Sequence, residues 1–168
     1  MAKKNLKQLK TLVIVYMNKP FQRKGSKSNA HVGKEFEIKA QAFFRSNNLI
    51  LERNISIDVG VEKIKKAHAF DLGCLEQKII VECKSHTWTS GNNVPSAKLT
   101  VWNEAMYYFL TAPDNFRKIM FVLHDFSEHR NETLAQYYLR TYHHLIPSSV
   151  EFWEYNQATS EALELKKI

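Results

Sequence analysis

Three charged side chains stand beside short apolar runs and have residue types that can do chemistry. Glu82 and Lys84 lie two residues apart in VECK, directly after the run II, and Asp71 follows AHAF. A charged group buried without a partner costs several kcal/mol, so these positions need a physical reason. Asp and Glu oxygens suit Mg²⁺, which prefers one or two carboxylates together with substrate phosphate and water. A lysine beside such an ion can orient an attacking water, which would give metal-assisted hydrolysis of a phosphodiester.

The two apolar runs are expected to form a β-hairpin around residues 75–78. A symmetric loop gives the pairs Cys74 with Ile79, Gly73 with Ile80, Leu72 with Val81, and Asp71 with Glu82. Opposed Cβ atoms lie ~4.5–5.5 Å apart, and like charges in that position repel. Strand alternation adds Lys84 to the face of Glu82 and Asp71. A divalent cation would remove the repulsion, whereas a surface salt bridge of Lys84 with either carboxylate is the alternative.

The segments FDLG and IIVECK resemble the motif of the PD-(D/E)xK nuclease superfamily. Asp71 matches its acidic residue, and Glu82, Cys83 and Lys84 match its ExK. The residue before the aspartate is Phe70 rather than proline, which is a departure from the pattern.

The resemblance implies an αβββαβ core over about residues 30–125 and cleavage of DNA with Mg²⁺, for which Mn²⁺ substitutes, leaving a 5′-phosphate. It implies that Asp71 and Glu82 hold the metal, with the Cys83 carbonyl as a further ligand. Lys84 would position the attacking water.

Many members of the superfamily also carry a glutamate on the first helix, in a G-x-x-F-E pattern. Gly33 to Glu37 match this pattern, which implies that Glu37 assists the site. On a helix, Glu35 and Glu37 both flank the apolar stripe, about 100° either side of Phe36. Glu35 has a surface explanation as an i,i+4 partner of Lys39. The motif favours Glu37, and Glu35 stays open as the alternative.

The polar segment after the ExK, residues 85–98, is rich in hydrogen-bonding side chains. It is expected to run along the substrate, with Trp88 stacked on or wedged between bases; the alternative is an ordinary polar loop with Trp88 packed beneath it. A basic loop at residues 19–34 is expected to contact phosphates. The residues expected to bind nucleic acid are Lys24, Lys27, Lys34, Ser85, His86, Thr87, Trp88, Asn92, Asn93 and Lys98.

The elements that must position these residues follow from periodicity. Helical spacing is expected at 32–46, at 96–112 with Ser96 as the cap, and at 131–144. Strands are expected at 49–60, 67–74, 78–84, 118–125 and 150–156, with a further strand or buried segment at 11–18. The buried stripe of the second helix is expected to be Leu99, Trp102, Met106, Phe109 and Leu110. The order predicts an α/β fold with a single mixed central sheet flanked by helices.

Composition sets the class of protein and of partner. The 168 residues are 44% hydrophobic, which is enough for a single domain over residues 1–168, with a basic arm and loop at about 1–31. The 24 Lys and Arg residues against 17 Asp and Glu give a net charge of +7, which favours a polyanionic partner. Residues 12–17 are too short an apolar run to cross a bilayer. Cys74 and Cys83 form no disulfide framework, so a cytoplasmic protein is expected, without a membrane or an organic cofactor.

The leading interpretation is a Mg²⁺-dependent endonuclease of restriction type that acts on duplex DNA. A Holliday-junction resolvase or DNA-repair nuclease on the same scaffold is the alternative, and a non-catalytic nucleic-acid-binding module is a further one. Because one small domain has one active site and a duplex has two strands, a homodimer is expected.

Overall fold

The computed structural model describes residues 29–166, which form one central sheet with helices on both faces. The helices are α2 (Asn29–Ser46), α3 (Ser96–Thr111), α4 (Leu134–Tyr142) and the short 3₁₀ helix η1 (His143–Leu145). The strands are β1 (Glu52–Val59), β2 (Lys66–Cys74), β3 (Ile79–Lys84), β4 (Arg117–Leu123), β5 (Phe126–Ser127), β6 (Glu132–Thr133), β7 (Val150–Asn156) and β8 (Glu161–Leu165).

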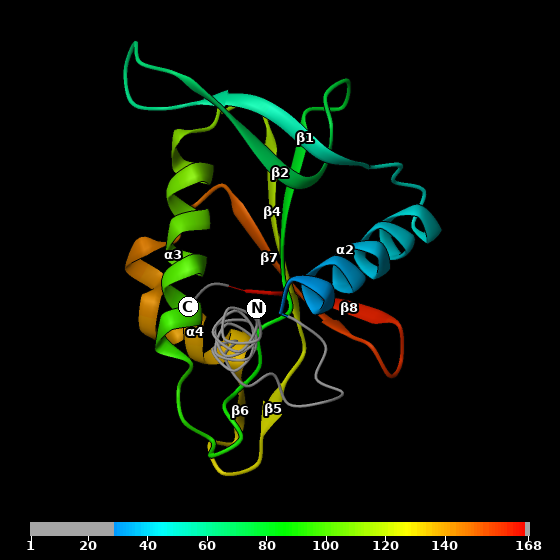
Figure 1. Ribbon diagram of the computed structural model, residues 1–168, viewed down its shortest axis with the longest axis vertical. Helices are drawn as coiled ribbons and strands as arrows, with labels where there is room; N and C mark the ends of the chain where they lie inside the picture. The colour runs from blue at the N-terminus through cyan, green and yellow to red at the C-terminus, as the bar shows by residue number, and fades with distance from the viewer. Residues whose placement is uncertain (1–28, 167–168) are drawn as a thin grey trace, which may run out of the picture.

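The main sheet has six strands in the order β1-β2-β3-β4-β7-β8. β3, β4 and β7 run parallel at its centre, and the other neighbouring strands are antiparallel. α2 lies on one side of the sheet, and α3 and α4 lie on the other (Figure 1). The protein is therefore an α/β protein with a mixed sheet, as the sequence predicts. Strand β8 and the small β5–β6 hairpin were not predicted.

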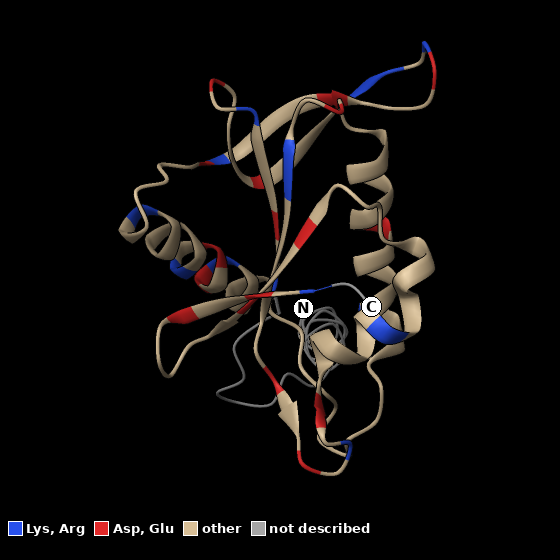
Figure 2. Ribbon diagram, turned by 180° about the vertical axis from the view of Figure 1, so that it is seen from behind, with Lys and Arg blue, Asp and Glu red and all other residues tan. Residues whose placement is uncertain are grey.

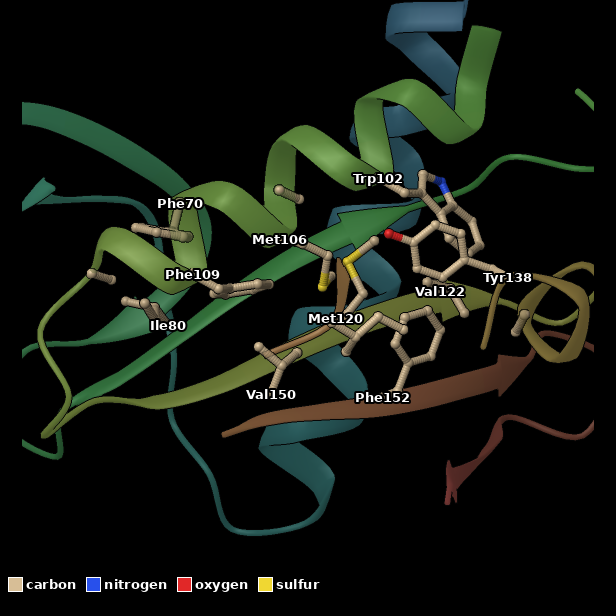
Figure 3. Close-up of a cluster of buried hydrophobic side chains, with 14 of the residues drawn as sticks. Phe70, Ile80, Trp102, Met106, Phe109, Met120, Val122, Tyr138, Val150 and Phe152 are labelled. Carbon is tan, nitrogen blue, oxygen red and sulfur yellow. The ribbon is translucent and has the colours of Figure 1, made fainter. Parts of the chain in front are cut away.

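The larger half of the core lies between the sheet and the helices α3 and α4. Figure 3 shows side chains of α3 above those of β4 and β7, with Tyr138 entering from α4. Its fully or nearly fully buried members include Phe70, Ile80, Trp102, Met106, Phe109, Met120, Val122, Tyr138, Val150 and Phe152. Because this layer is closed by large side chains, it fixes α3 against the strand ends that carry Glu82 and Lys84.

The smaller half of the core lies under α2. Phe36, Ala40 and Phe44 recur every four residues and form its buried stripe. They pack on Val81 and Phe121, among other residues of the strands. The ring centroids of Phe44 and Phe121 are 5.0 Å apart. This packing places the face of α2 that carries Glu37 near the same end of the sheet.

Several predicted details of the helices are wrong. Ser96 is not a cap: the N-cap position belongs to Pro95, and no side chain caps α3 there. Leu110 is 62% exposed rather than buried, and Ala105 occupies the stripe. α4 starts later than predicted because residues 132–133 pair with β5 and Thr133 forms a capping box with Gln136.

The predicted segment 11–18 lies outside the described residues. None of the helices within residues 29–166 is long and apolar enough to cross a membrane.

Candidate active site

The β2–β3 hairpin has the predicted register up to the edge of the site. Its pairs are Cys74–Ile79, Gly73–Ile80 and Leu72–Val81. Position 73 of β2 requires glycine, because a Cβ there would lie 2.5 Å from the Ile79 carbonyl oxygen of β3. Asp71 lies one residue beyond the paired stretch. There its Oδ2 accepts a 2.7 Å hydrogen bond from the backbone N–H of Cys83, so the Asp71 side chain is bound to β3.

Strand β2 breaks its alternation at Asp71. Phe70 belongs to the core under α3, whereas Leu72, two residues on, belongs to the core under α2. The pairing with β1 skips the same point, where Asn54 has a φ of 54°. The simple alternation expected from the sequence is therefore wrong at this residue. The register is the same on both sides of this point, with Arg53 opposite Leu72 and Ile55 opposite Phe70, so neither strand has an inserted residue and the break coincides with the left-handed backbone of Asn54.

The two carboxylates nevertheless converge on one atom. Lys84 Nζ donates a hydrogen bond to Glu82 Oε2 and lies 3.9 Å from Asp71 Oδ2. The side chains of Lys84 and Glu82 are only 12% and 8% exposed. The arrangement is thus a mostly buried cluster rather than the surface salt bridge considered as the alternative, whose members would be largely solvated.

Burial and charge set the protonation of the cluster. Burial raises the pKa of Asp71 from 3.8 to about 6, with the charge of Glu82 adding to the effect, while Lys84 and the Cys83 N–H oppose it. Burial alone would raise the pKa of Glu82, but His68 and Lys84 outweigh burial and lower it. Burial alone would lower the pKa of Lys84, but Glu82 and Asp71 outweigh burial and raise it. Glu82 and Lys84 are therefore charged at neutral pH, and Asp71 is the residue of the cluster whose charged form is disfavoured.

Cys83 contributes to the site through its backbone. Burial raises the pKa of its thiol well above the ordinary value, followed by the charge of Asp71, so the sulfur stays protonated at neutral pH. A protonated thiol is a poor metal ligand. If Cys83 is a ligand, its carbonyl oxygen must serve, as the resemblance implies.

Glu37 lies near the cluster but has its own partner. Its Oε2 accepts a 2.6 Å hydrogen bond from Arg53 Nη2 of β1. Its charge still contributes to the raised pKa of Asp71, as the smallest of the causes. Glu35 instead lies 3.2 Å from His31, its i−4 neighbour, so the expected partner Lys39 is wrong; Lys39 binds Gln157. The structure therefore places Glu37 beside the site and gives Glu35 a surface contact.

His68 is a site residue that the sequence analysis missed. Its Nε2 lies 3.5 Å from Glu82 Oε1, and its ring stacks on Tyr108 of α3 with centroids 3.6 Å apart. The only sequence signal is a polar residue in the run AHAF, three positions before Asp71. Tyr108 lies far along the chain, so local spacing could not have revealed the stack.

A cleft of about 640 Å³ opens directly beside Lys84, between the N-terminal turns of α2 and α3. Gly33 lines it from α2, which leaves the exposed Lys34 next to its rim. The polar residues that line it are Lys84, Ser85, His86, Thr87, Thr89, Ser96 and Lys98. Four of the residues expected to bind nucleic acid, from Ser85 to Thr87 and Lys98, therefore line the same cleft as Lys84, whereas Asp71 and Glu82 do not line it.

His86 is held in this cleft as a neutral donor. Trp102 Nε1–H donates to His86 Nδ1 at 2.8 Å, so a neutral His86 carries its proton on Nε2. Burial, then the charges of Lys98 and Lys84, lower the pKa of His86 to about 4. The ring can therefore donate a hydrogen bond into the cleft without carrying charge at neutral pH.

Trp88 does not line the cleft, and its expected stacking on bases does not fit its placement. Trp88 is 8% exposed, and its backbone N–H donates to Asp125 Oδ2 at 2.6 Å. The guanidinium of Arg130 lies over its ring, 4.9 Å from the centroid. This is the packed loop considered as the alternative. Asn92 and Asn93 are exposed residues of the same loop but lie outside the cleft lining, and Lys24 and Lys27 lie outside the described residues.

No family model matches the chain, and no curated protein or solved structure matches it either. The assignment of chemistry therefore rests on the geometry of the chain's own residues.

The residues present fit a hard divalent cation. The donor set has the right chemistry: two carboxylates lie near the same ammonium nitrogen, and the charge of Glu82 adds to burial in raising the pKa of Asp71. Within the described part of the chain, no three His, Cys, Asp or Glu side chains form a group that could hold a metal ion. Mg²⁺ requires only one or two carboxylates when water and substrate phosphate complete its shell.

Proposed function

We propose that the protein is a Mg²⁺-dependent endonuclease that hydrolyses phosphodiester bonds in duplex DNA, of restriction type. The observation that carries the proposal is the convergence of Asp71 and Glu82 on Lys84 Nζ, because Lys84 also lines the cleft. The element order α2-β1-β2-β3-α3-β4 supports a restriction-endonuclease-like core, because it has the αβββαβ order that the resemblance implies.

Each residue of the cluster has a distinct task in this proposal. Asp71 and Glu82 hold the cation, and Glu37 supports Asp71 from α2. Bound Mg²⁺ supplies charge neutralisation at the phosphate and lowers the pKa of an attacking water. Lys84, buried and charged, stabilises the negative charge that develops during attack, which is the role of a preorganised electrostatic group.

The cleft beside the cluster would hold the sugar–phosphate backbone. His86 offers a neutral donor, Lys98 a positive charge, and Ser85 and Thr87 offer hydroxyl groups. Phosphate contacts of this kind position a duplex without reading its sequence.

The positive charge needed for DNA binding is unevenly distributed. Residues 1–28 contain eight of the 24 Lys and Arg residues and none of the 17 Asp and Glu. Residues 29–166 contain 15 basic and 17 acidic residues, which are interspersed over the elements rather than gathered on one of them (Figure 2). We therefore assign most of the electrostatic attraction to the basic segment that includes Lys24 and Lys27.

The decisive experiment incubates the purified chain with phage-length duplex DNA and Mg²⁺. Discrete bands support a restriction enzyme, cleavage of branched DNA alone supports a Holliday-junction resolvase or repair nuclease, and a mobility shift without cleavage supports a binding module. Mn²⁺ should replace Mg²⁺. A homodimer is proposed because two strands require two sites, and sedimentation of the DNA complex tests it.

Two variants test the site itself. Asp71→Ala and Glu82→Ala should each abolish cleavage while DNA binding persists, because the carboxylates hold the cation rather than the duplex. Asp58→Ala, at an exposed position of β1, is the control and should keep full activity. Wild-type turnover in either site variant would refute the assignment.

A further inference from the structure

We propose that His68 is a positioning residue for Glu82, donating from Nε2–H to Oε1 and so fixing the orientation of the carboxylate. Any role of this contact in hydrolysis rests on the proposed function. The contact itself does not, since it concerns only two side chains of the described structure.

The position of the His68 ring is strongly constrained. Tyr108 stacks on one face with an interplanar angle of 13°, and Phe70 meets the ring nearly perpendicularly with centroids 4.8 Å apart. These contacts come from α3 and from β2 itself, so the ring is held by the same layer that holds the core together. An imidazole clamped in this way can orient a neighbouring group at little entropic cost.

The nitrogen that faces Glu82 is the one that lacks a partner. His68 Nε2 is buried and has no hydrogen-bond partner within residues 29–166, although it lies 3.5 Å from Glu82 Oε1. A buried polar atom without a partner is costly, and a closure of a few tenths of an ångström would give a good hydrogen bond. Approach to a carboxylate is favourable only if Nε2 carries the proton, which selects the tautomer.

The two oxygens of Glu82 are then engaged by different groups. Lys84 binds Oε2 and also lies near Asp71, so it is shared between the carboxylates. His68 approaches only Oε1. We infer that His68 keeps Glu82 in place when Lys84 changes partner, which a single Lys–Glu contact could not do. Residues that orient a metal-binding carboxylate in this manner typically change metal affinity by ~10–100-fold when removed.

The first test is independent of activity and of metal. The ¹⁵N resonances of the His68 ring in the full chain at pH 7.5 should show a proton on Nε2, and Glu82→Gln should shift the Nε2–H signal. His144→Gln, at an exposed histidine of η1, should leave that signal unchanged. A proton on Nδ1, or a His68 signal indifferent to Glu82→Gln, overturns the inference.

The second test measures metal affinity without DNA, by electron paramagnetic resonance of Mn²⁺. His68→Ala should weaken binding by ~10-fold or more. His68→Gln should stay within about threefold of wild type, because its amide N–H can reach the place of Nε2, whereas the shorter His68→Asn should not rescue. Tyr108→Ala should weaken binding and Tyr108→Phe should not, since Phe keeps the stack.

The outcomes separate this inference from the proposed function. Wild-type affinity in His68→Ala overturns the positioning role even if the protein is a nuclease. If the protein binds no Mn²⁺ and cuts no DNA but its His68 signal responds to Glu82→Gln, the proposed nuclease function is overturned and the hydrogen bond between His68 and Glu82 is supported. If His68→Ala does not fold, the Mn²⁺ affinities of His68→Gln and His68→Asn are compared instead, and equal affinity in the two variants overturns the inference.

Discussion

Asp71→Asn should make the protein more stable at neutral pH while it removes cleavage. Burial and the charge of Glu82 raise the pKa of Asp71, so its ionised form is costly in the folded state. Asn keeps an oxygen that can accept the Cys83 N–H but carries no charge. The variant therefore loses the free-energy cost of the buried charge. If the ion pair with Lys84 outweighed that cost, the variant would instead be less stable than wild type.

The size and sign of the effect follow from linkage. A pKa raised from 3.8 to about 6 means stability that is fully present below pH 3.8 and is lost as the pH rises through about 6. The complete loss corresponds to about 3 kcal/mol. Between pH 4.5 and 7.5, the advantage of Asp71→Asn over wild type should therefore grow by about 2 kcal/mol. For a chain of this length, a growth of about 2 kcal/mol corresponds to a growth on the order of 4–8 °C in the Tm difference between the two proteins.

Urea unfolding of both proteins in EDTA, at pH 4.5, 6 and 7.5, measures this difference. His86 has a lowered pKa and its stability contribution is lost as the pH falls from 6.5 towards 4, but it is present in both proteins and cancels. Asp58→Asn, which replaces an exposed carboxylate of β1, is the control against which the gain of Asp71→Asn is read. A less stable Asp71→Asn at pH 7.5, or a difference that does not vary with pH, would refute the reasoning.

Three further predictions concern the lysines and His86. Lys84→Ala should slow single-turnover cleavage by ~10²-fold or more with little change in the Mg²⁺ concentration required. Lys84→Arg should restore little of the rate, because the planar guanidinium cannot place a point charge at the same position. A near-normal rate in Lys84→Arg would favour a plain salt bridge between Lys84 and Glu82. Neutralising Lys24 and Lys27 together should weaken binding to all sequences and reduce the log–log salt slope by about one to two, and unchanged affinity at low salt would contradict this. His86 should stay neutral down to pH about 4, and Trp102→Phe should raise that pKa towards the ordinary value, both followed by NMR titration; a wild-type value near 6.5 would refute the buried, neutral His86.

The hairpin and the cluster of Asp71, Glu82 and Lys84 could be predicted because their determinants are local. The four-residue loop at 75–78 fixes the register, and the register brings the end of β2 to the end of β3. That proximity sufficed to place Asp71, Glu82 and Lys84 together. The face of Asp71 could not be derived this way, since it depends on the break in the pairing with β1 at Asn54.

The residues that were missed or misplaced depend on partners distant in the chain. Trp88 is buried because Asp125, which comes after β4, binds its backbone and its indole. His68 belongs to the site because α3 supplies Tyr108. Strand β8 has no continuous apolar pattern, as Leu163 is 67% exposed, and it forms by pairing with β7. Spacing along the chain contains none of these relations.

The net charge of the cluster of Asp71, Glu82 and Lys84 limits which ligands can approach it. A phosphate cannot approach ionised Asp71 and Glu82 unless their charge is compensated, and Lys84 alone leaves the cluster with a net charge of about −1. Residues 29–166 as a whole are slightly acidic, so their net charge does not favour a polyanionic partner. In the proposed mechanism, attraction comes from the basic residues 1–28 and local neutralisation from a bound cation. In the proposed mechanism, binding and chemistry are therefore separable: variants of the basic segment should change affinity, and variants of the cluster should change rate.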